Sequence, residues 1–341
     1  MAGLEILVLV GFLLAAYSVI ANDAIQTLGT FLASNAHRPW WVLWIYASSI
    51  VVVIMVYGMW ALNNDIGFGR LNRIPFPEGG IQWWHAVPPL VLAFLTRWGI
   101  PVSTTFLVLT LFAMTGGAAT EGVMEKMLVK SALGYLVAFA SGAIIYLIVA
   151  RTFERWVLRT RDTAPAPYWV ILQWLSTAFL WSQWLMQDLA NIFVYLPRTT
   201  TVVDGQTQVS FDPMVIGIAT LIILVLQGYI FATRGGKIQQ IVLVKINTTD
   251  IRSATIIDFI YGLVLYFFKE LNDVPMSTTW VFLGLLAGRE LATAFMTGAR
   301  SNREAAKDVG MDMGRAFFGL IVSVVLAFSM PWIATGEMPR F

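Results

Sequence analysis

Apolar stretches of membrane-spanning length constrain this chain more than any other feature. Two of them, Trp40–Leu62 and Pro213–Thr233, contain no charged residue. A transmembrane helix needs about 20 apolar residues to cross the hydrocarbon core of a bilayer. The whole chain is 58% hydrophobic and only 12% charged, a composition that excludes an ordinary soluble domain. The sequence therefore predicts an all-α polytopic membrane protein embedded in the lipid bilayer.

Several function classes are disfavoured by the polar residues. The chain has no cysteine, which excludes disulfides, thiol catalysis and cysteine-based metal sites. Its two histidines, His37 and His85, lie in separate loops, and no hydrolytic signature is visible, so we do not expect an enzyme. A net charge of +2 without a basic run gives no sign of nucleic-acid binding. The first apolar stretch, Leu4–Ala21, lacks a positively charged start, so we interpret it as a retained helix rather than a signal peptide.

Two long apolar stretches are interrupted by carboxylate and amide side chains. Leu4 to Ser34 is interrupted at Asn22-Asp23 and again at Gln26. Tyr168 to Leu196 is interrupted at Gln187-Asp188 and again at Asn191. Each stretch is too long for one simple crossing, so we expect a broken helix in both places.

Two further stretches are divided near their centres by proline. Trp83–Gly117 is divided at Gly99-Ile100-Pro101, and Ala254–Ala294 at Asn272-Asp273-Val274-Pro275. In the first of these, each limb of about 15 residues reaches only about 22 Å, short of the ~30 Å core. We therefore expect re-entrant helical hairpins that enter and leave the membrane on the same side.

The same order of elements occurs twice. A broken helix, a plain span, a hairpin and another span follow one another in residues 1–150 and again in residues 168–341, with a basic connector at residues 151–167. The closing spans are Leu128–Ala150 and Met311–Thr335. Each half then crosses the membrane an odd number of times, which predicts two repeats of inverted topology.

The distribution of Lys and Arg predicts the orientation. With the N-terminus outside, the cytoplasmic segments carry most of the basic residues, including the cluster Arg151, Arg155, Arg159 and Arg161 in the connector. This bias follows the positive-inside rule and places both termini outside the cell membrane.

A short phrase occurs once in each hairpin. It reads Ile-Pro-Val-Ser-Thr-Thr at Ile100–Thr105, here called the first tip, and Val-Pro-Met-Ser-Thr-Thr at Val274–Thr279, the second tip. Proline is well tolerated at the start of a helix, where free backbone N–H groups point outward and attract anions. Capping and helix packing would explain a single copy. Two copies at opposed hairpins favour anion binding by the hydroxyl residues Ser103, Thr104, Thr105, Ser277, Thr278 and Thr279.

The acidic residues at the two broken helices form a second pair. A carboxylate at the bilayer centre costs on the order of 3 kcal/mol, so Asp23 and Asp188 must face a cavity, a cation or each other. Carboxylate and amide oxygens at interrupted helix positions suit a monovalent cation such as Na⁺. The alternative is that they only hold neighbouring helices together by hydrogen bonds.

Four charged residues lie beside the tips. Arg97 and Lys269 could contribute positive charge to an anion site, neutralise a nearby acid, or reach the membrane interface. Lys269, Glu270 and Asp273 could pair with one another, and an acid among them could carry a proton if burial raised its pKa.

These motifs resemble the inorganic phosphate transporter (PiT) family. Ala21-Asn22-Asp23-Ala24-Ile25-Gln26 looks like the Asn-Asp signature of that family, Met186-Gln187-Asp188-Leu189-Ala190-Asn191 looks like its second copy, and a Pro-x-Ser-Thr-Thr phrase follows each. The resemblance implies a sodium/phosphate symporter built from inverted repeats. Ion ligands would come from Asn22, Asp23, Gln26, Gln187, Asp188 and Asn191, and phosphate ligands from the tips. No cofactor is implied beyond sodium as the coupling ion, and a homodimer is suggested.

The chain departs from the family pattern at several positions. Gln187 and Gln26 stand where the two signatures have Asn, and Phe106 and Trp280 stand where His is common after the tip. These departures concern the substrate and the coupling ion rather than the fold. Besides sodium-driven phosphate symport by alternating access, the sequence leaves open a symporter of another oxyanion such as sulfate, coupling to protons, and an anion channel.

Overall fold

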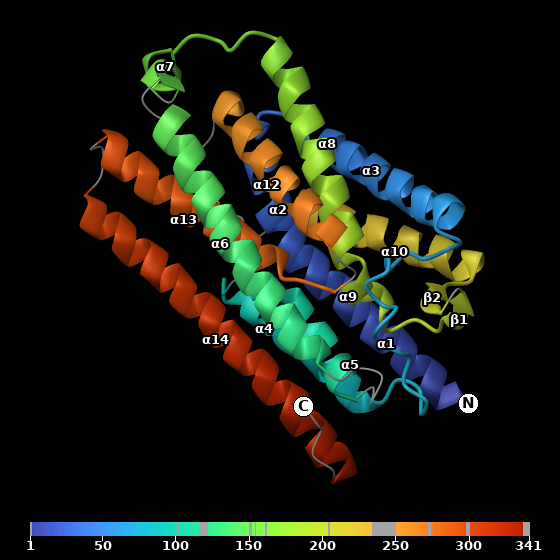
Figure 1. The fold of residues 1–341 in the computed structure, drawn as a ribbon. Coiled ribbons are helices and arrows are strands. Elements are labelled where there is room, and N and C mark those ends of the chain that lie inside the picture. Colours follow the sequence, from blue (N-terminus) through green and yellow to red (C-terminus); the bar gives the residue numbers. More distant parts are fainter. Residues whose placement is uncertain are drawn as a thin grey trace.

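The computed structural model describes residues 2–100, 102–115, 122–149, 152–153, 155–160, 162–203, 205–233, 250–271, 274–297 and 301–336. Helices account for nearly all of this regular structure (Figure 1). In the described part of the chain, six helices are long and apolar enough to cross a membrane. The prediction of an all-α polytopic membrane protein is thereby confirmed.

The first half contains both kinds of interruption that the sequence predicts. Its elements are α1 (Ala2–Val19), the π-helical turn η1 (Ile20–Ala24), α2 (Ile25–Ser34), α3 (Trp40–Ala61), η2 (Trp83–Ala86), α4 (Val87–Arg97), η3 (Thr105–Leu109), α5 (Thr110–Thr115) and α6 (Val123–Val149). Asn22 and Asp23 lie within η1, so the first broken helix widens by one π turn rather than ending. Such turns often mark functional sites, because they redirect side chains without breaking the backbone hydrogen bonding.

The second half follows the connector, which contains α7 (Arg155–Arg159). Its elements are α8 (Tyr168–Asp188), α9 (Ala190–Phe193), β1 (Thr199–Val203), β2 (Gln206–Ser210), α10 (Pro213–Ala232), α12 (Ile251–Leu271), α13 (Thr278–Thr297) and α14 (Asn302–Thr335). Helix α8 ends at Asp188, where the sequence predicts the second break. The break between α12 and α13 also lies at the predicted position.

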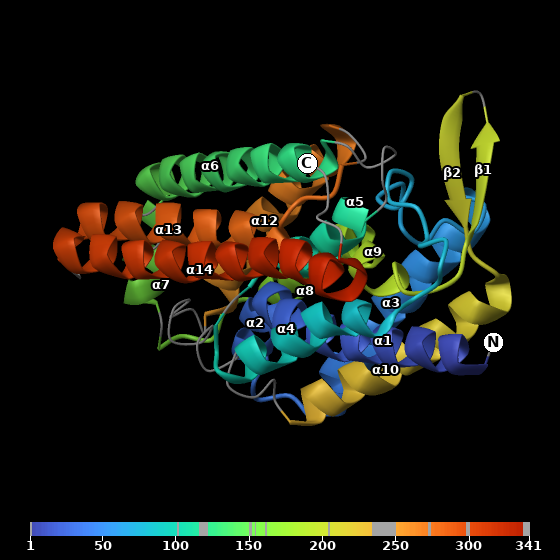
Figure 2. The same cartoon turned by 90° about the horizontal axis from the view of Figure 1, so that it is seen from below.

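Two elements differ from the expectation. The antiparallel hairpin β1–β2, with Val203 opposite Gln206, was not expected, and it projects from the helical body (Figure 2). Helix α14 begins at Asn302, nine residues before the apolar stretch that begins at Met311, because Ser301 caps it and its first turns are solvated. A helix can extend beyond the bilayer where its side chains are polar, which hydropathy alone does not reveal.

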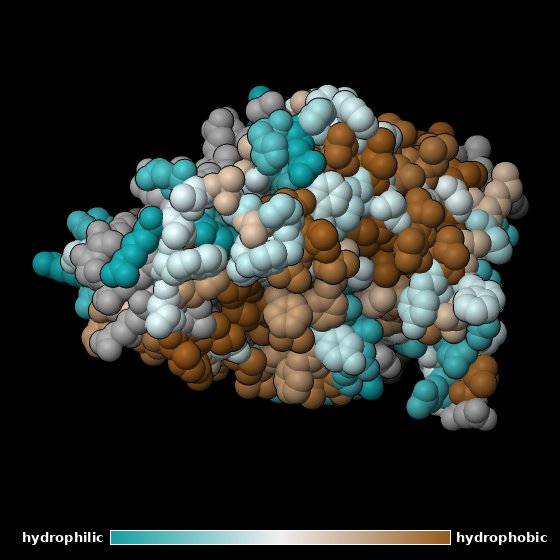
Figure 3. All heavy atoms as spheres, turned by 90° about the horizontal axis from the view of Figure 1, so that it is seen from above, coloured by the Kyte–Doolittle hydropathy of each residue, from teal (hydrophilic) through white to brown (hydrophobic). Residues whose placement is uncertain are grey.

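Apolar side chains cover much of the surface. Figure 3 shows hydrophobic residues across the middle of one face, with hydrophilic residues mostly towards its ends. Large exposed residues include Val53, Trp60, Ile148, Leu175 and Phe295. In a soluble protein such patches would promote aggregation, whereas in a bilayer they face lipid.

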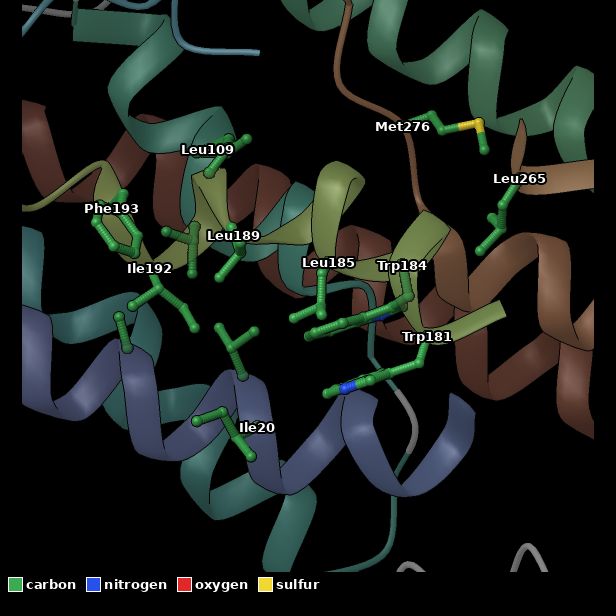
Figure 4. Close-up of a cluster of buried hydrophobic side chains, with 14 of the residues drawn as sticks. Ile20, Leu109, Trp181, Trp184, Leu185, Leu189, Ile192, Phe193, Leu265 and Met276 are labelled. Atoms are coloured by element: carbon green, nitrogen blue, oxygen red, sulfur yellow. The ribbon is translucent and has the colours of Figure 1, made fainter. Parts of the chain in front are cut away.

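The interior is organised around the broken helices. Trp181 and Trp184 of α8 stack with their ring centroids 4.6 Å apart and their planes 6° apart. Figure 4 shows these rings beside Leu185 and Leu189, with Ile20 on the facing helix. Since Ile20, Trp184 and Leu189 are all buried, this apolar layer packs the first broken helix against the second.

Helices α6 and α13 approach each other unusually closely. A Cβ atom at Gly288 would lie 2.1 Å from the carbonyl oxygen of Phe139, and one at Gly284 would lie 2.3 Å from that of Tyr135. Small residues permit such contact between membrane helices. Consequently α13, which follows the second tip, is held tightly against a helix from the first half.

Candidate anion and cation binding site

The two hairpin tips meet in the interior. The Thr105 hydroxyl donates to the Met276 carbonyl at 3.1 Å, and the Thr279 hydroxyl donates to the Val102 carbonyl at 3.3 Å. Met276 and Val102 occupy the same position in the repeated phrase, so each tip bonds the other in the same way. The structure thus brings together two segments about 170 residues apart, as the sequence predicts. Pro101 of the first tip lies outside the described residues.

The serines of both tips cap the helices that follow. The Phe106 N–H donates to Ser103 Oγ and the Trp280 N–H donates to Ser277 Oγ, both at 3.2 Å. A hydroxyl that accepts in this way keeps its own proton for an acceptor elsewhere. Capping and anion binding, weighed above as alternatives, are therefore compatible in Ser103 and Ser277.

The first acidic residue is bonded to the first tip. Asp23 accepts from the Thr104 hydroxyl at 2.5 Å and from the Asn22 amide at 2.7 Å. The same Asn22 amide donates to the Val102 carbonyl at 2.7 Å. These contacts attach the first tip to the π turn of the first broken helix.

The second acidic residue bonds to the same tip. Asp188 accepts from the Thr105 hydroxyl at 3.1 Å and from the Asn191 amide at 2.7 Å. Asn191 also donates to the Thr104 hydroxyl at 3.0 Å. Asp23 and Asp188 lie close enough to interact electrostatically, and both are almost completely buried. One cluster therefore contains both tips and both carboxylates.

Several buried side-chain oxygens of this cluster accept no hydrogen bond from the described residues. Among the described residues, no hydrogen-bond donor reaches Asn191 Oδ1, Gln187 Oε1 or Gln26 Oε1. Buried polar atoms without protein partners are rare in folded proteins, and a bound water or ion can satisfy them. Carboxylate and amide oxygens are hard donors that suit Na⁺, and they belong to residues that the sequence singles out as ion ligands.

The two glutamines behave differently from the two asparagines. Asn22 and Asn191 bond the carboxylates, whereas the Gln187 amide donates to the Leu265 carbonyl at 3.1 Å. Neither the amide nitrogen nor the amide oxygen of the Gln26 side chain has a hydrogen-bond partner among the described residues.

The charged residues beside the tips lie further out. Arg97 is exposed at the end of α4, and the structure does not bring it into the buried cluster. Lys269 pairs with Glu270 at 2.9 Å in a partly exposed position, which fits the charge-pair alternative for these two residues. Asp273, the fourth of the charged residues singled out from the sequence, lies outside the described residues.

Arg70 and Asp258 are among the buried charged residues that the sequence did not single out. Arg70 is 1% exposed although it lies in a polar loop, and Asp258, fully buried in α12, accepts hydrogen bonds from Thr30 and Thr177. Asp258 lies inside a predicted apolar stretch, so its charge could have identified it as a candidate buried polar residue from the sequence. The burial of Arg70 depends on how the loop docks, which no local pattern reveals.

Comparisons with known proteins agree with the motifs. No family model matches the chain. Over 186 residues it is 23% identical to a Pyrococcus furiosus protein described as a "putative phosphate permease"; the match covers 49% of this chain and 43% of that relative. The chain thus matches less than half of the length of this relative.

A solved structure of a sodium-dependent phosphate transporter resembles this chain over nearly its whole length. The TM-score is 0.58, and the match covers 99% of this chain and 100% of the other at 14% sequence identity. An identity this low establishes a shared fold only. Together with the Asn-Asp and Ser-Thr-Thr motifs, the two comparisons confirm that this polytopic membrane protein resembles the PiT family.

Proposed function

We propose that this chain is a sodium-driven symporter of inorganic phosphate. The observation that carries the proposal is that both hydroxyl-rich tips and both membrane-buried aspartates belong to one hydrogen-bonded cluster. The relatives support it, since one is described as a phosphate permease and the other as a sodium-dependent phosphate transporter.

The tips would bind the anion. Ser103 and Ser277 keep free protons at the starts of two helices, where backbone N–H groups and the helix dipole favour negative charge. A tetrahedral oxyanion can accept from both tips at once. The hydroxyls would then replace the hydration shell that the anion loses on entering the membrane interior.

The residues of the broken helices would bind the coupling cation. Asp23 and Asp188 supply charge, and the unpartnered oxygens of Asn191, Gln187 and Gln26 supply further ligands. A cation and an anion bound side by side offset each other's cost of burial, whereas either alone is poorly tolerated at low dielectric. This shared site is the physical basis of the coupling.

Alternating access would come from the two halves of the chain. We assign residues 1–150 and 168–341 as inverted repeats joined by the connector 151–167, with both termini outside. The equivalent hydrogen bonds from Thr105 and Thr279 across the tips support this assignment. Movement of one repeat against the other would expose the cluster to each side in turn.

The test is uptake of radiolabelled oxyanions by the full chain in proteoliposomes. We expect saturable phosphate uptake that requires an inward sodium gradient. Unlabelled phosphate should inhibit the uptake of the labelled phosphate by competition. Preferred uptake of sulfate would change the substrate, and uptake driven by a pH gradient alone would replace sodium with protons. Linear, non-saturating flux would instead indicate an anion channel and overturn the symporter.

A further inference from the structure

A buried tyrosine of α12 is directed at the second tip. Tyr261 is only 2% exposed, and its hydroxyl donates to the backbone carbonyl of Thr278 at 3.0 Å. Thr278 is the first residue of α13. Tyr261 also lies close enough to Asp188 and Asp23 to interact electrostatically with both. A tyrosine hydroxyl thus reaches the second tip beside the two buried carboxylates.

The residue that Tyr261 bonds is in contact with one of these carboxylates. The side chain of Thr278 lies within hydrogen-bonding reach of Asp188. Its counterpart in the first tip, Thr104, donates to Asp23 at 2.5 Å. Both threonines occupy the same position in the repeated phrase, so each tip presents the same hydroxyl to the carboxylate of its own half. Because a side chain starts from its backbone, a bond that fixes the Thr278 backbone also sets the direction of the Thr278 hydroxyl.

Helix α12 is held in place on both sides of Tyr261. One turn earlier, Asp258 accepts from the Thr177 hydroxyl at 2.6 Å. One turn later, the Leu265 carbonyl accepts from the Gln187 amide at 3.1 Å. Both donors belong to α8, so these bonds fix α12 against the second broken helix, which carries Asp188.

The residue after Tyr261 brings the two helices into close contact. A Cβ atom at Gly262 would lie 2.7 Å from the ring of Phe179 and 3.2 Å from the Cα atom of Leu180. The Tyr261 ring packs against Phe282 of α13, with the ring centroids 5.6 Å apart. A side chain that is locked by packing on a rigid helix positions its neighbours precisely. Tyr261 meets this requirement.

The first half lacks a tyrosine at the corresponding place in the sequence. Tyr261 is fourteen residues before Pro275, whereas Val87 is fourteen residues before Pro101. Valine has no hydroxyl to donate. Thr104 of the first tip instead accepts from the Asn191 amide at 3.0 Å. The two equivalent threonines are therefore positioned by different groups.

We infer that Tyr261 is a positioning residue of the cation site, which acts by holding the Thr278 backbone so that the Thr278 hydroxyl points at Asp188. This inference rests on the proposed function for the identity of the cation as sodium. It makes the affinity for sodium depend on a hydroxyl that lies on α12, outside both the Asn-Asp signatures and the tips.

Sodium binding measured without transport tests the inference. Sodium chloride, added in place of choline chloride, should raise the unfolding temperature of the chain in detergent, because a ligand that binds the folded state stabilises it. Tyr261→Phe should raise the sodium concentration at half-maximal stabilisation about fivefold, as expected when one hydrogen bond is lost. Tyr266→Phe removes an exposed hydroxyl from the same helix and is the matched control, with an unchanged midpoint. If Tyr261→Phe lowered only the unfolding temperature without sodium, its hydroxyl would be structural and the inference would be overturned.

A double variant tests whether Tyr261 acts through Thr278. Thr278→Val removes the hydroxyl whose direction Tyr261 sets, so adding Tyr261→Phe should then change the sodium midpoint by less than about twofold, since residues that act through one another are not additive. A further rise of about fivefold would overturn this route. Phosphate uptake is measured separately in proteoliposomes. A wild type with the expected sodium midpoints but without phosphate uptake would refute the proposed function alone.

Discussion

The two tips share a sequence phrase but are held in place differently. The first tip is bonded by the broken helices of both halves, through Asn22 to Val102, Asp23 to Thr104 and Asp188 to Thr105. The second tip is bonded by α6 of the other half, through Lys130 and Ser131. Both keep the same serine cap.

This difference shows which properties of a tip come from its own sequence and which come from the helices that pack against it. The cap follows from the local sequence, because a serine at the start of a helix reaches the N–H three residues on. The charge around the tip depends on which helix packs against it. Hydroxyls of the first tip bond to carboxylates, and a carbonyl of the second tip accepts a hydrogen bond from an ammonium group.

The largest expected effect comes from neutralising the carboxylates next to the first tip. Asp23→Asn or Asp188→Asn should reduce sodium-driven phosphate uptake by about 100-fold or more, since loss of a buried charged partner costs on the order of 3 kcal/mol. Initial rates in proteoliposomes measure this, with the exposed Glu125→Gln as control. Wild-type rates in either Asp variant would remove that residue from the coupling site.

Removing one serine hydroxyl at a time compares the tips directly. Ser277→Ala and Ser103→Ala should each weaken phosphate binding by roughly 1.5–3 kcal/mol, the contribution of a hydrogen bond to a charged group. The KM for phosphate measures the effect, and thermal unfolding shows whether the lost cap also reduces stability. If only Ser277→Ala raised KM, the second tip alone would bind the anion; if neither did, the hydroxyls would serve as caps only.

Adding a methyl group at two close helix contacts compares the packing of α6 on α13, the helix that follows the second tip, with the packing of α14 on the first tip. Gly288→Ala should destabilise the protein by about 1–3 kcal/mol, because the new Cβ would meet the Phe139 backbone oxygen at 2.1 Å. Gly319→Ala should cost less, since its Cβ would meet only the Val102 side chain at 3.0 Å. Thermal unfolding in detergent measures both. Equal losses would mean that α14 packs on the first tip as tightly as α6 packs on α13.

The smallest expected effect concerns the residue that precedes the second hairpin. Burial raises the pKa of Asp250. Its hydrogen bonds and ion pair with Arg252 together lower the pKa by more than burial raises it, so the pKa lies below the ordinary value. A carboxyl group whose pKa is lower in the folded than in the unfolded state stabilises the folded state at pH values above its unfolded-state pKa. This stabilisation is lost as the pH falls through the folded-state pKa.

Asp250→Asn should therefore reduce stability at neutral pH by less than about 1 kcal/mol, because partial exposure screens the pair. The deficit should vanish at strongly acidic pH. Unfolding temperatures of the two proteins across a pH series measure it, and a constant difference at every pH would contradict the assigned ion pair.

The motif residues were predictable because charged residues and prolines are energetically costly inside apolar membrane stretches, which makes them easy to recognise in the sequence. Asp23 and Asp188 interrupt apolar stretches, and the proline-containing phrases interrupt two others, so each stands out against its neighbours. The helices that carry them also follow from length and hydropathy. Lys130 did not stand out, because a lysine near the start of a span is usually at the membrane interface.

By itself, the sequence determined the helical membrane fold, the positions of the breaks and the chemical type of each tip, because these depend on local hydropathy and helix capping. Only the tertiary structure decided which groups meet: the cross-bonds between the tips, the attachment of Asp188 to Thr105, and the contact of Lys130 with Val274. Such contacts join residues more than 80 positions apart, and they follow from how the helices pack rather than from any neighbouring sequence.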